Sequence, residues 1–211
     1  MQSLVGYQLA DSVATITVDD GKVNVLSLRA ITEINQALDR ALDDAAVVVL
    51  AGRPGVFSAG FDLPVIRAGG PAATSMLRAG FDLAERVLSY PRPVVIACTG
   101  HAVAMGAFLL LSGDYRVGAA GPYKITANEV AIGLTMPRAA VEICRQRLTP
   151  AHFWDTVHGI TQHLGGLDQD AHKATKLRAR KAALVAVHDA IAADNADLAQ
   201  REQAAATVQA R

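Results

Sequence analysis

The first part of the chain alternates between segments of strand and of helix character. Residues 13–18 are β-branched, alternate in polarity and precede a turn signal at 19–21, which predicts a strand. From Ser27 to about Asp44 apolar residues recur every three or four positions, so we expect a helix with Ser27 as its N-cap. The continuous apolar run 47–50 then predicts a strand buried on both faces, as in a parallel sheet.

The same order of strand and helix recurs further along the chain. Residues 54–70 are rich in glycine and proline and predict a loop, and Pro71 begins a helical pattern that ends near Leu88. Strands that alternate with helices predict an α/β fold whose ligands bind at the carboxyl ends of the strands. The remaining predictions are a buried strand at 94–98, a glycine-rich turn at 100–106, an apolar helix from 107, short strands at 115–117 and 123–126, and helical structure from 139 onward.

The last part of the sequence differs in composition. Residues 171–209 are rich in alanine, lysine, arginine and glutamine and contain few helix breakers. Such a composition is typical of one or two long helices that need a partner surface. We find no convincing internal repeat in the sequence itself.

The overall composition is that of a globular protein without a strong electrostatic field. Of the 211 residues 51% are hydrophobic, and 20 basic side chains balance 20 acidic ones. A neutral chain offers no general attraction for nucleic acid or for an anionic membrane. No secretory leader is apparent and the apolar runs are too short to span a bilayer, so we expect no membrane insertion. Cys98 and Cys144 lie in apolar stretches, which favours reduced thiols and a cytoplasmic location.

Two turns of small residues are the candidate chemical feature. They are Phe57–Leu63 and Gly100–Gly106, each directly after a predicted strand or loop segment. Main-chain N–H groups in such turns can approach one carbonyl oxygen, which is what stabilisation of an enolate requires. Each turn taken alone is equally consistent with a tight connection between a strand and a helix. Glu129 is a candidate base, although a lone glutamate is more often an ordinary surface or paired carboxylate.

These segments resemble the enoyl-CoA hydratase/isomerase (crotonase) family. Phe57–Leu63 reads F-S-A-G-F-D-L and is similar to the F-S-A-G-x-D-L segment of that family, and the similarity continues through 93–116 and 128–134. The resemblance covers roughly residues 4–150. It implies an α/β spiral of repeated ββα units, with a core over 1–145 that holds the CoA thioester site. Residues 146–211 would form a helical C-terminal region for oligomerisation, into a homotrimer or a dimer of trimers.

The resemblance also assigns roles to individual positions. It implies that the Phe61 and Met105 N–H groups form the oxyanion hole and that Glu129 is the base. The substrate would be an acyl-CoA thioester, with no separate cofactor and no metal. Relatives usually have glycine at the position of Met105, so its donor requires that its φ stays negative. The other substrate-binding positions implied are Val23, Val25, Leu26, Ala59, Gly60, Asp62, Leu63, Gly106, Phe108 and Leu134.

Phe108 departs from the pattern of the hydratases, which use two glutamates. The first of these falls at Phe108, while Glu129 matches the second and also the single base of the 3,2-enoyl-CoA isomerases. The resemblance therefore favours an isomerase, in which Phe108, Leu134 and Met136 form a dry wall that raises the pKa of Glu129. The alternatives are a hydratase or another crotonase-type activity, and a non-catalytic CoA-binding or assembly subunit.

Other polar residues favour structural roles. We expect Asp62 and Asp114 to brace nearby backbone. The histidines at 152, 158, 163 and 172 form no recognised metal-ligand pattern, and His101 is expected to be packed or to face solvent. The basic run 173–181 suggests a solvated helix face, whereas the resemblance implies that basic residues of this region contact the phosphates of CoA. After Trp154 the chain lacks a stretch that relatives usually carry, so the C-terminal region is expected to be shortened.

Overall fold

Two β-sheets form the base of the computed structural model, which describes residues 3–129, 134–148 and 169–209. In the larger sheet β1 runs antiparallel to β2 and the other neighbours are parallel, whereas all pairs in the smaller sheet are parallel. The larger sheet has the order β1 (Val5–Ala10), β2 (Val13–Val18), β3 (Val47–Gly52), β5 (Val94–Cys98) and β7 (Tyr115–Gly118). The smaller has the order β4 (Gly55–Ser58), β6 (Gly100–Val103) and β8 (Ile125–Thr126).

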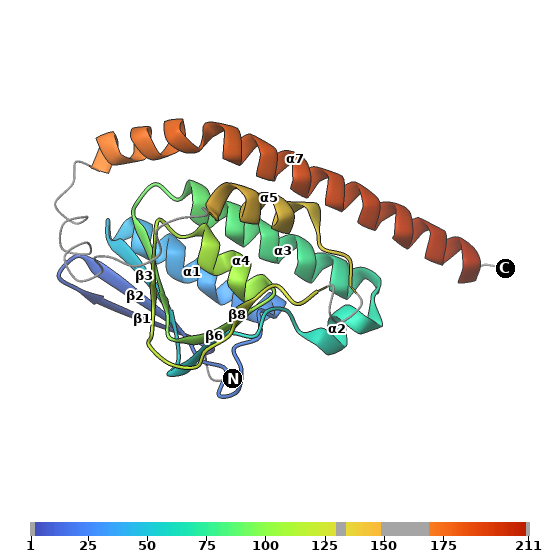
Figure 1. The fold of residues 1–211 in the computed structure, drawn as a ribbon, viewed down its shortest axis with the longest axis horizontal. Coiled ribbons are helices and arrows are strands. Elements are labelled where there is room, and N and C mark those ends of the chain that lie inside the picture. Colours follow the sequence, from blue (N-terminus) through green and yellow to red (C-terminus); the bar gives the residue numbers. More distant parts are fainter. Residues whose placement is uncertain (1–2, 130–133, 149–168, 210–211) are drawn as a thin grey trace.

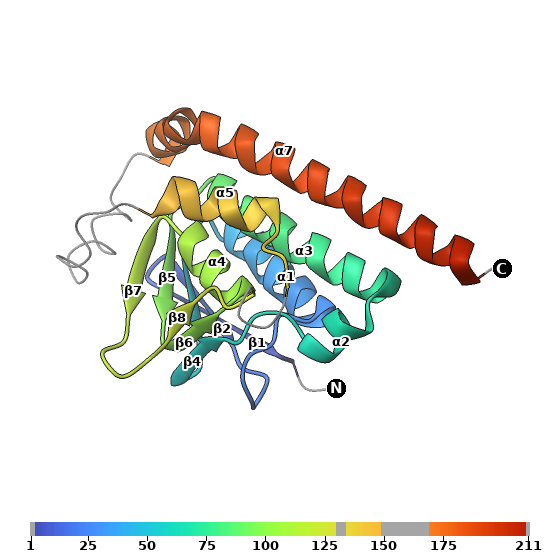
Figure 2. The same ribbon diagram turned by 45° about the vertical axis from the view of Figure 1, so that its right-hand side comes forward.

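The helices cover the strands in two layers (Figures 1 and 2). α1, α3 and α4 lie directly against the strands, while α5 and α7 lie over them, and the C-terminal end of α7 extends past the rest of the molecule. The bounds are α1 (Leu28–Asp43), α2 (Leu63–Ala68), α3 (Gly70–Ser89), α4 (Met105–Ser112), α5 (Arg138–Arg147) and α7 (Gln169–Gln209).

A unit of two strands and a helix recurs along the chain. β3 and β5 enter the larger sheet, each is followed by a strand of the smaller sheet, and α2–α3 or α4 comes next. β7 and β8 repeat this step before α5. This is the expected ββα arrangement. The repeat is invisible in the sequence because it lies in the connectivity and not in the residue types.

Most predicted elements are present, and the errors concern short ones. The predicted strands at 13–18, 47–50 and 94–98 are β2, β3 and β5, and the helix from Ser27 is α1, whose Ala30 N–H donates to the Ser27 hydroxyl at 3.2 Å. The prediction of a continuous loop over 54–70 is wrong, because β4 and α2 lie within it. Likewise the glycine turn begins with strand β6, and the predicted strand at 123–126 shortens to β8. β1 was not predicted; most of its residues are exposed, and only Val5 and Tyr7 pack, partly buried, against the core.

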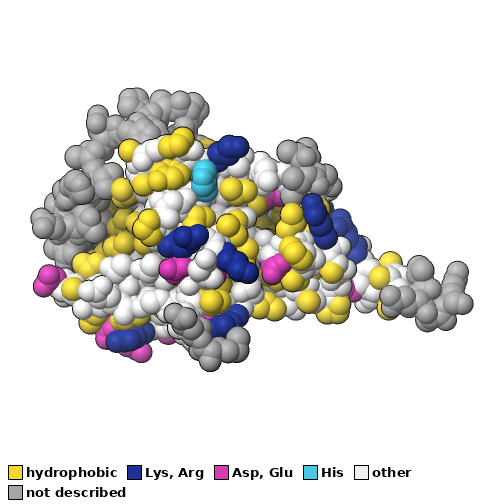
Figure 3. All heavy atoms as spheres, turned by 90° about the horizontal axis from the view of Figure 1, so that it is seen from below, with side chains coloured by type: hydrophobic (Ala, Val, Ile, Leu, Met, Phe, Trp, Pro, Cys, Tyr) yellow, Lys and Arg dark blue, Asp and Glu magenta, His cyan; other side chains and the backbone are white. Residues whose placement is uncertain are grey.

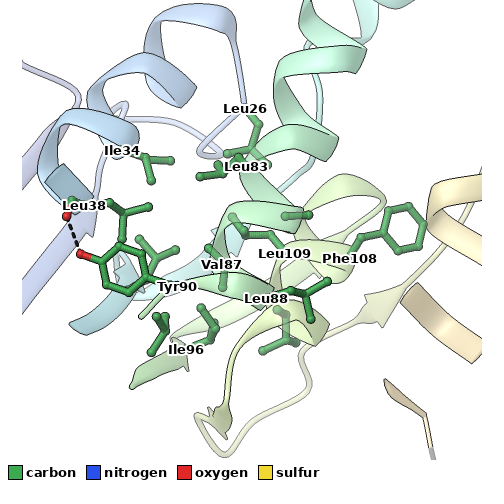
Figure 4. Packing of buried hydrophobic residues seen from close by; sticks show 14 of the residues in the cluster. Leu26, Ile34, Leu38, Leu83, Val87, Leu88, Tyr90, Ile96, Phe108 and Leu109 are labelled. Carbon is green, nitrogen blue, oxygen red and sulfur yellow. Dashed lines mark hydrogen bonds between the residues drawn. The ribbon is translucent and has the colours of Figure 1, made fainter. Parts of the chain in front are cut away.

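The main hydrophobic core lies between the sheets and the first layer of helices (Figure 4). Leu38 of α1, Val87 of α3, Ile96 of β5 and Leu109 of α4 all contribute and are almost fully buried. The hydroxyl of Tyr90 donates a hydrogen bond to the Leu38 carbonyl across this core. A buried phenol needs such a partner, so this bond ties the end of α3 to α1.

A buried ion pair attaches α7 to the sheets. The Arg180 guanidinium lies 2.7 Å from an Asp114 carboxylate oxygen, with side chains only 14% and 6% exposed, and it also donates to the Leu88 carbonyl at 2.9 Å. Asp114 in turn accepts from the Val94 N–H at 2.7 Å. The prediction that Asp114 braces backbone is confirmed. The expectation of a solvated face over 173–181 is wrong at Arg180, because this arginine is mostly buried and pairs with the buried Asp114.

Replacing Arg180 tests how strongly α7 is held. Arg180→Met leaves the Asp114 carboxylate buried without this partner, and we expect a loss of about 3 kcal/mol in the free energy of unfolding, measured by chemical denaturation. Lys181→Met, at the exposed neighbouring position, is the matched control and should leave stability unchanged. Equal stability of the two variants would show that the ion pair contributes nothing to the attachment of α7.

Candidate active site

The two glycine-containing turns meet at the carboxyl ends of β4 and β6. These strands are parallel neighbours, with Ser58 paired to Ala102, so the turns that follow them emerge side by side. A Cβ placed on Gly60 would lie 2.7 Å from the Val103 oxygen and 3.1 Å from the Met105 nitrogen. The absence of a side chain at Gly60 therefore permits this close approach of the two turns.

Two main-chain donors are available at this junction. Within the part of the chain that the structure describes, neither the Phe61 nor the Met105 N–H donates to a protein acceptor. Met105 is the first residue of α4, where N–H groups have no intrahelical partner and the helix dipole adds partial positive charge. The φ of Met105 is not positive, so the condition set for this donor is met, and the positive φ falls on Ala104 (52°) instead.

A buried polar network braces the first turn. The Asn24 side chain donates to the carbonyls of Val18 and Phe57 at 2.8 and 3.2 Å. The Ser58 hydroxyl donates to the Asn24 carbonyl at 2.7 Å and accepts from the Gly60 N–H at 3.0 Å. Sequence reasoning assigned no role to Asn24 or Ser58. The signal available was the residue type, since asparagine tolerates the left-handed φ of 54° that it adopts here.

The loop before α1 runs alongside this turn. The Ala59 N–H donates to the Val23 carbonyl at 2.9 Å, and the Leu26 N–H donates to the Gly60 carbonyl at 2.8 Å, next to a bridge between Val25 and Gly60. Val23 is 49% exposed, whereas Leu26 points into the core (Figure 4). The structure thus brings these predicted positions together, but it leaves Leu26 only its main chain for contact with a ligand.

A surface hollow of about 350 Å³ opens beside this loop. Figure 3 shows the face on the side of β6, β8 and α2, where basic and acidic side chains are scattered among hydrophobic ones. The side chains around the hollow include two basic groups, an imidazole and small apolar groups, so they can contact a ligand that carries both charge and apolar surface. The hollow is lined in part by Lys22, Val23, Arg53, Ala59, His101 and Val103.

Two further predicted positions belong to the start of α2. The Asp62 side chain accepts from the Val65 N–H at 3.4 Å as the N-cap of α2, which confirms its bracing role, and Leu63 is the first helical residue. Gly106 lies on the other side of the junction, where a Cβ would meet the Ser58 carbonyl oxygen at 2.5 Å. Asp62 therefore caps α2, and the absence of a side chain at Gly106 permits the close packing of the second turn on Ser58.

Glu129 is a buried carboxylate with unused hydrogen-bonding capacity. It is 9% exposed, and its Oε2 and the Oδ1 of Asn128 have no hydrogen-bond partner among the described residues. Burial raises the pKa of Glu129, and its own backbone N–H only partly opposes this shift. The Leu134 N–H donates to the Glu129 carbonyl at 2.9 Å and so holds its backbone. The direction of the pKa shift is the one predicted for a dry surrounding.

An aromatic cluster lies behind the junction. Phe108 is 1% exposed and stacks on Phe81 with ring centroids 6.3 Å apart, and Phe61 meets the same Phe81 ring edge-on at 6.3 Å. Phe61 also covers Gly80, where a Cβ would come within 2.3 Å of its ring. Met136 packs against the same core. Phe108 is therefore a core residue that supplies apolar surface and no acid or base.

The remaining polar candidates show no competing chemistry in the described parts of the chain. The His101 ring nitrogen accepts from the Lys124 N–H at 2.9 Å and packs on Tyr123, which makes it a structural residue. No group of three potential metal ligands occurs within the described residues, and no helix there has the length and apolarity to cross a membrane. The predicted gap after Trp154 and the histidines at 152, 158 and 163 lie outside the described residues.

Comparison with known proteins identifies the family of this arrangement. The family model for enoyl-CoA hydratase/isomerase matches residues 8–153. An enoyl-CoA hydratase/isomerase family protein from Pseudomonas syringae superimposes with a TM-score of 0.86 at 40% identity, over 92% of this chain and 98% of that one. An enoyl-CoA isomerase of Mycobacterium tuberculosis gives a TM-score of 0.83 at 43% identity, over 93% and 99% of the two chains. The predicted fold class is confirmed.

Curated relatives match over a shorter stretch. A probable enoyl-CoA hydratase of Mycobacterium avium is 34% identical over 125 residues, which are 58% of this chain and 48% of the relative. The human mitochondrial enoyl-CoA delta isomerase 1 is 34% identical over 139 residues, which are 64% and 46% of the two chains. This chain thus spans about half the length of the curated relatives it matches. Both hydratases and isomerases occur among them, so their names do not select one reaction.

Alanine substitutions at Gly60 and Gly55 distinguish the effect of the close contact between the two turns from the effect of backbone strain. Gly60 and Gly55 both have positive φ, of 83° and 87°, but a Cβ on Gly55 meets nothing within 4 Å. We expect Gly55→Ala to cost about 1 kcal/mol from the left-handed backbone and Gly60→Ala about 3 kcal/mol, because its Cβ also meets main-chain atoms. Chemical denaturation measures both, and equal losses would contradict the close contact between the turns.

Proposed function

The chain belongs to the enoyl-CoA hydratase/isomerase family, and on that basis we propose that it is a 3,2-enoyl-CoA double-bond isomerase with a single glutamate base. The observation that carries this proposal is the buried Glu129, whose carboxylate has a raised pKa. The position at which hydratases have their first glutamate holds the buried Phe108 instead. One carboxylate suffices for isomerisation, because the proton taken from C2 can be returned at C4. Addition of water needs an ordered water and a second acid or base.

The oxyanion hole would consist of the Phe61 and Met105 N–H groups. When a thioester carbonyl oxygen lies between them, both can donate to the negative charge that develops as the enolate forms. A preorganised donor of this kind contributes about 3 kcal/mol to transition-state stabilisation, which corresponds to roughly two orders of magnitude in rate. These two N–H groups donate to no acceptor among the described residues, and this supports the assignment.

The proton transfers would then use Glu129 alone. The carboxylate removes a proton from C2, and the electron pair of that bond forms the enolate. In the second step the carbonyl re-forms, a double bond forms between C2 and C3, and the C3–C4 double-bond pair takes the proton back at C4. Desolvation makes the Glu129 carboxylate a stronger base, and the apolar surface of Phe108 and Met136 limits the entry of competing water.

The CoA moiety would occupy the hollow beside Val23 and Ala59. Lys22 and Arg53 supply positive charge there, and phosphate groups prefer such basic side chains. CoA is part of the substrate, so no separate cofactor is proposed. The C-terminal region 146–211 would serve assembly into a trimer or a dimer of trimers, since α7 is longer than the body of the protein that it covers. The free thiols of Cys98 and Cys144 favour a cytoplasmic location.

An enoyl-CoA hydratase is the second candidate. It is favoured by the two buried acceptor atoms, Asn128 Oδ1 and Glu129 Oε2, which together could hold an ordered water. Purified protein offered 2-enoyl-CoA and 3-enoyl-CoA side by side separates the candidates. Water addition to the 2-enoyl thioester selects the hydratase, and acyl-CoA binding without turnover of either thioester selects a non-catalytic CoA-binding subunit.

Removal of the base gives the direct test of the mechanism. Glu129→Gln keeps the shape of the side chain but cannot accept the proton, and we expect kcat on 3-enoyl-CoA to fall about 10³-fold. The control is Glu142→Gln on α5, whose carboxylate pairs with the exposed Arg145 and accepts from Gln146, and for which we expect kcat to stay unchanged. A Glu129→Gln enzyme as fast as wild type would exclude Glu129 as the base.

The raised pKa of Glu129 predicts opposite effects of pH on activity and stability. The base must be ionised, so kcat should rise with pH through a range above the ordinary value of 4.5. The folded state holds this proton more tightly than the unfolded state, so the Glu129 contribution to stability falls as pH rises through the same range. Glu129→Gln should therefore gain Tm relative to wild type as pH increases. A constant difference in Tm between pH 4 and pH 8 would contradict a desolvated carboxylate.

A further inference from the structure

Ala104 holds the least favourable backbone conformation at the junction of the two turns. Its dihedral angles are φ 52° and ψ −123°. This combination lies outside the left-handed helical region, and glycine adopts it far more readily than alanine does. Among the described residues, the other non-glycine residues with positive φ are Asp11, Ser12, Asn24 and Ala45. The conformation of Ala104 is thus one that its surroundings must impose.

Hydrogen bonds on both sides of Ala104 impose this conformation. Its N–H donates to the Thr126 carbonyl of β8 at 2.8 Å. Its carbonyl accepts from the N–H groups of Ala107 and Phe108 at 2.8 and 3.2 Å, in the first turn of α4. The residue is therefore held between the smaller sheet and the helix. Strain that is maintained in this way is commonly found where geometry serves function.

The position of Ala104 links it to both candidate donors. Its ψ sets the plane of the peptide that joins it to Met105, and therefore the direction of the Met105 N–H. Its methyl group lies against Gly60, because a Cβ on that glycine would be 3.0 Å from the Ala104 Cβ. Gly60 directly precedes Phe61. One small side chain thus contacts the turn that carries the first donor while its backbone orients the second.

We propose that Ala104 is a positioning residue, which uses its constrained backbone to aim the Met105 N–H and its methyl group to set the spacing from the Phe61 turn. This role rests on the proposed function. A glycine at this position would adopt the same angles more easily, but it would also allow others and would remove the methyl contact. The folded protein would then be more stable, but the two donors of the oxyanion hole would be less preorganised.

The test is Ala104→Gly compared with Ala45→Gly. Ala45 has the same φ of 52° but lies after α1, where it donates to Leu42. We expect both variants to raise Tm by a few degrees, since each relieves a left-handed alanine. Only Ala104→Gly should lower kcat on 3-enoyl-CoA, by about 10-fold with KM unchanged, because the donors matter most in the transition state.

The outcomes separate this inference from the proposed function. An active wild type whose Ala104→Gly variant keeps full kcat would show that Ala104 has only a structural role. A parallel loss of kcat in Ala45→Gly would assign the effect to general loosening and overturn the inference too. A wild type that turns over no enoyl thioester would refute the proposed function, and the positioning role would fall with it.

Discussion

The close contact between the parallel strands β4 and β6 is the constraint on which the rest of the site depends. A Cβ on Gly100 would lie 2.0 Å from the Gly55 oxygen, and one on Gly106 would lie 2.5 Å from the Ser58 oxygen. Side chains at these glycines would force the strands and their turns apart. Because the turns follow the strands directly, this contact also decides where the N–H groups after them can point. The Asn24 network holds the outer side of the same contact.

The burial of the Glu129 carboxylate favours the chemistry of the site more than the stability of the fold. The Glu129 carboxylate is desolvated and its Oε2 has no hydrogen-bond partner among the described residues, which is unfavourable for stability and favourable for basicity. The aromatic cluster of Phe61, Phe81 and Phe108 supplies the packing that offsets this cost.

The C-terminal helix α7 is held to the body of the protein by both apolar packing and polar contacts. α7 packs on α3 and α5, its Val187 and Ile191 are buried in the core, and the Arg180 pair with Asp114 connects it to the start of β7. Asp114 at the same time accepts from the backbone of β5. One carboxylate thus joins two neighbouring strands and a helix that is far away in the sequence.

The sequence by itself determined the order of the longer strands and helices, the Ser27 cap and the glycine turns, because each depends on residues within a few positions of one another. Its F-S-A-G-F-D-L motif also indicated the family. Tertiary structure decided the rest. β4 and α2 form within an apparent loop, Arg180 of the basic run reaches a buried carboxylate, and the positive φ falls on Ala104 and not on Met105. These features arise from contacts between segments that are distant along the chain, and no local pattern of residue types records them.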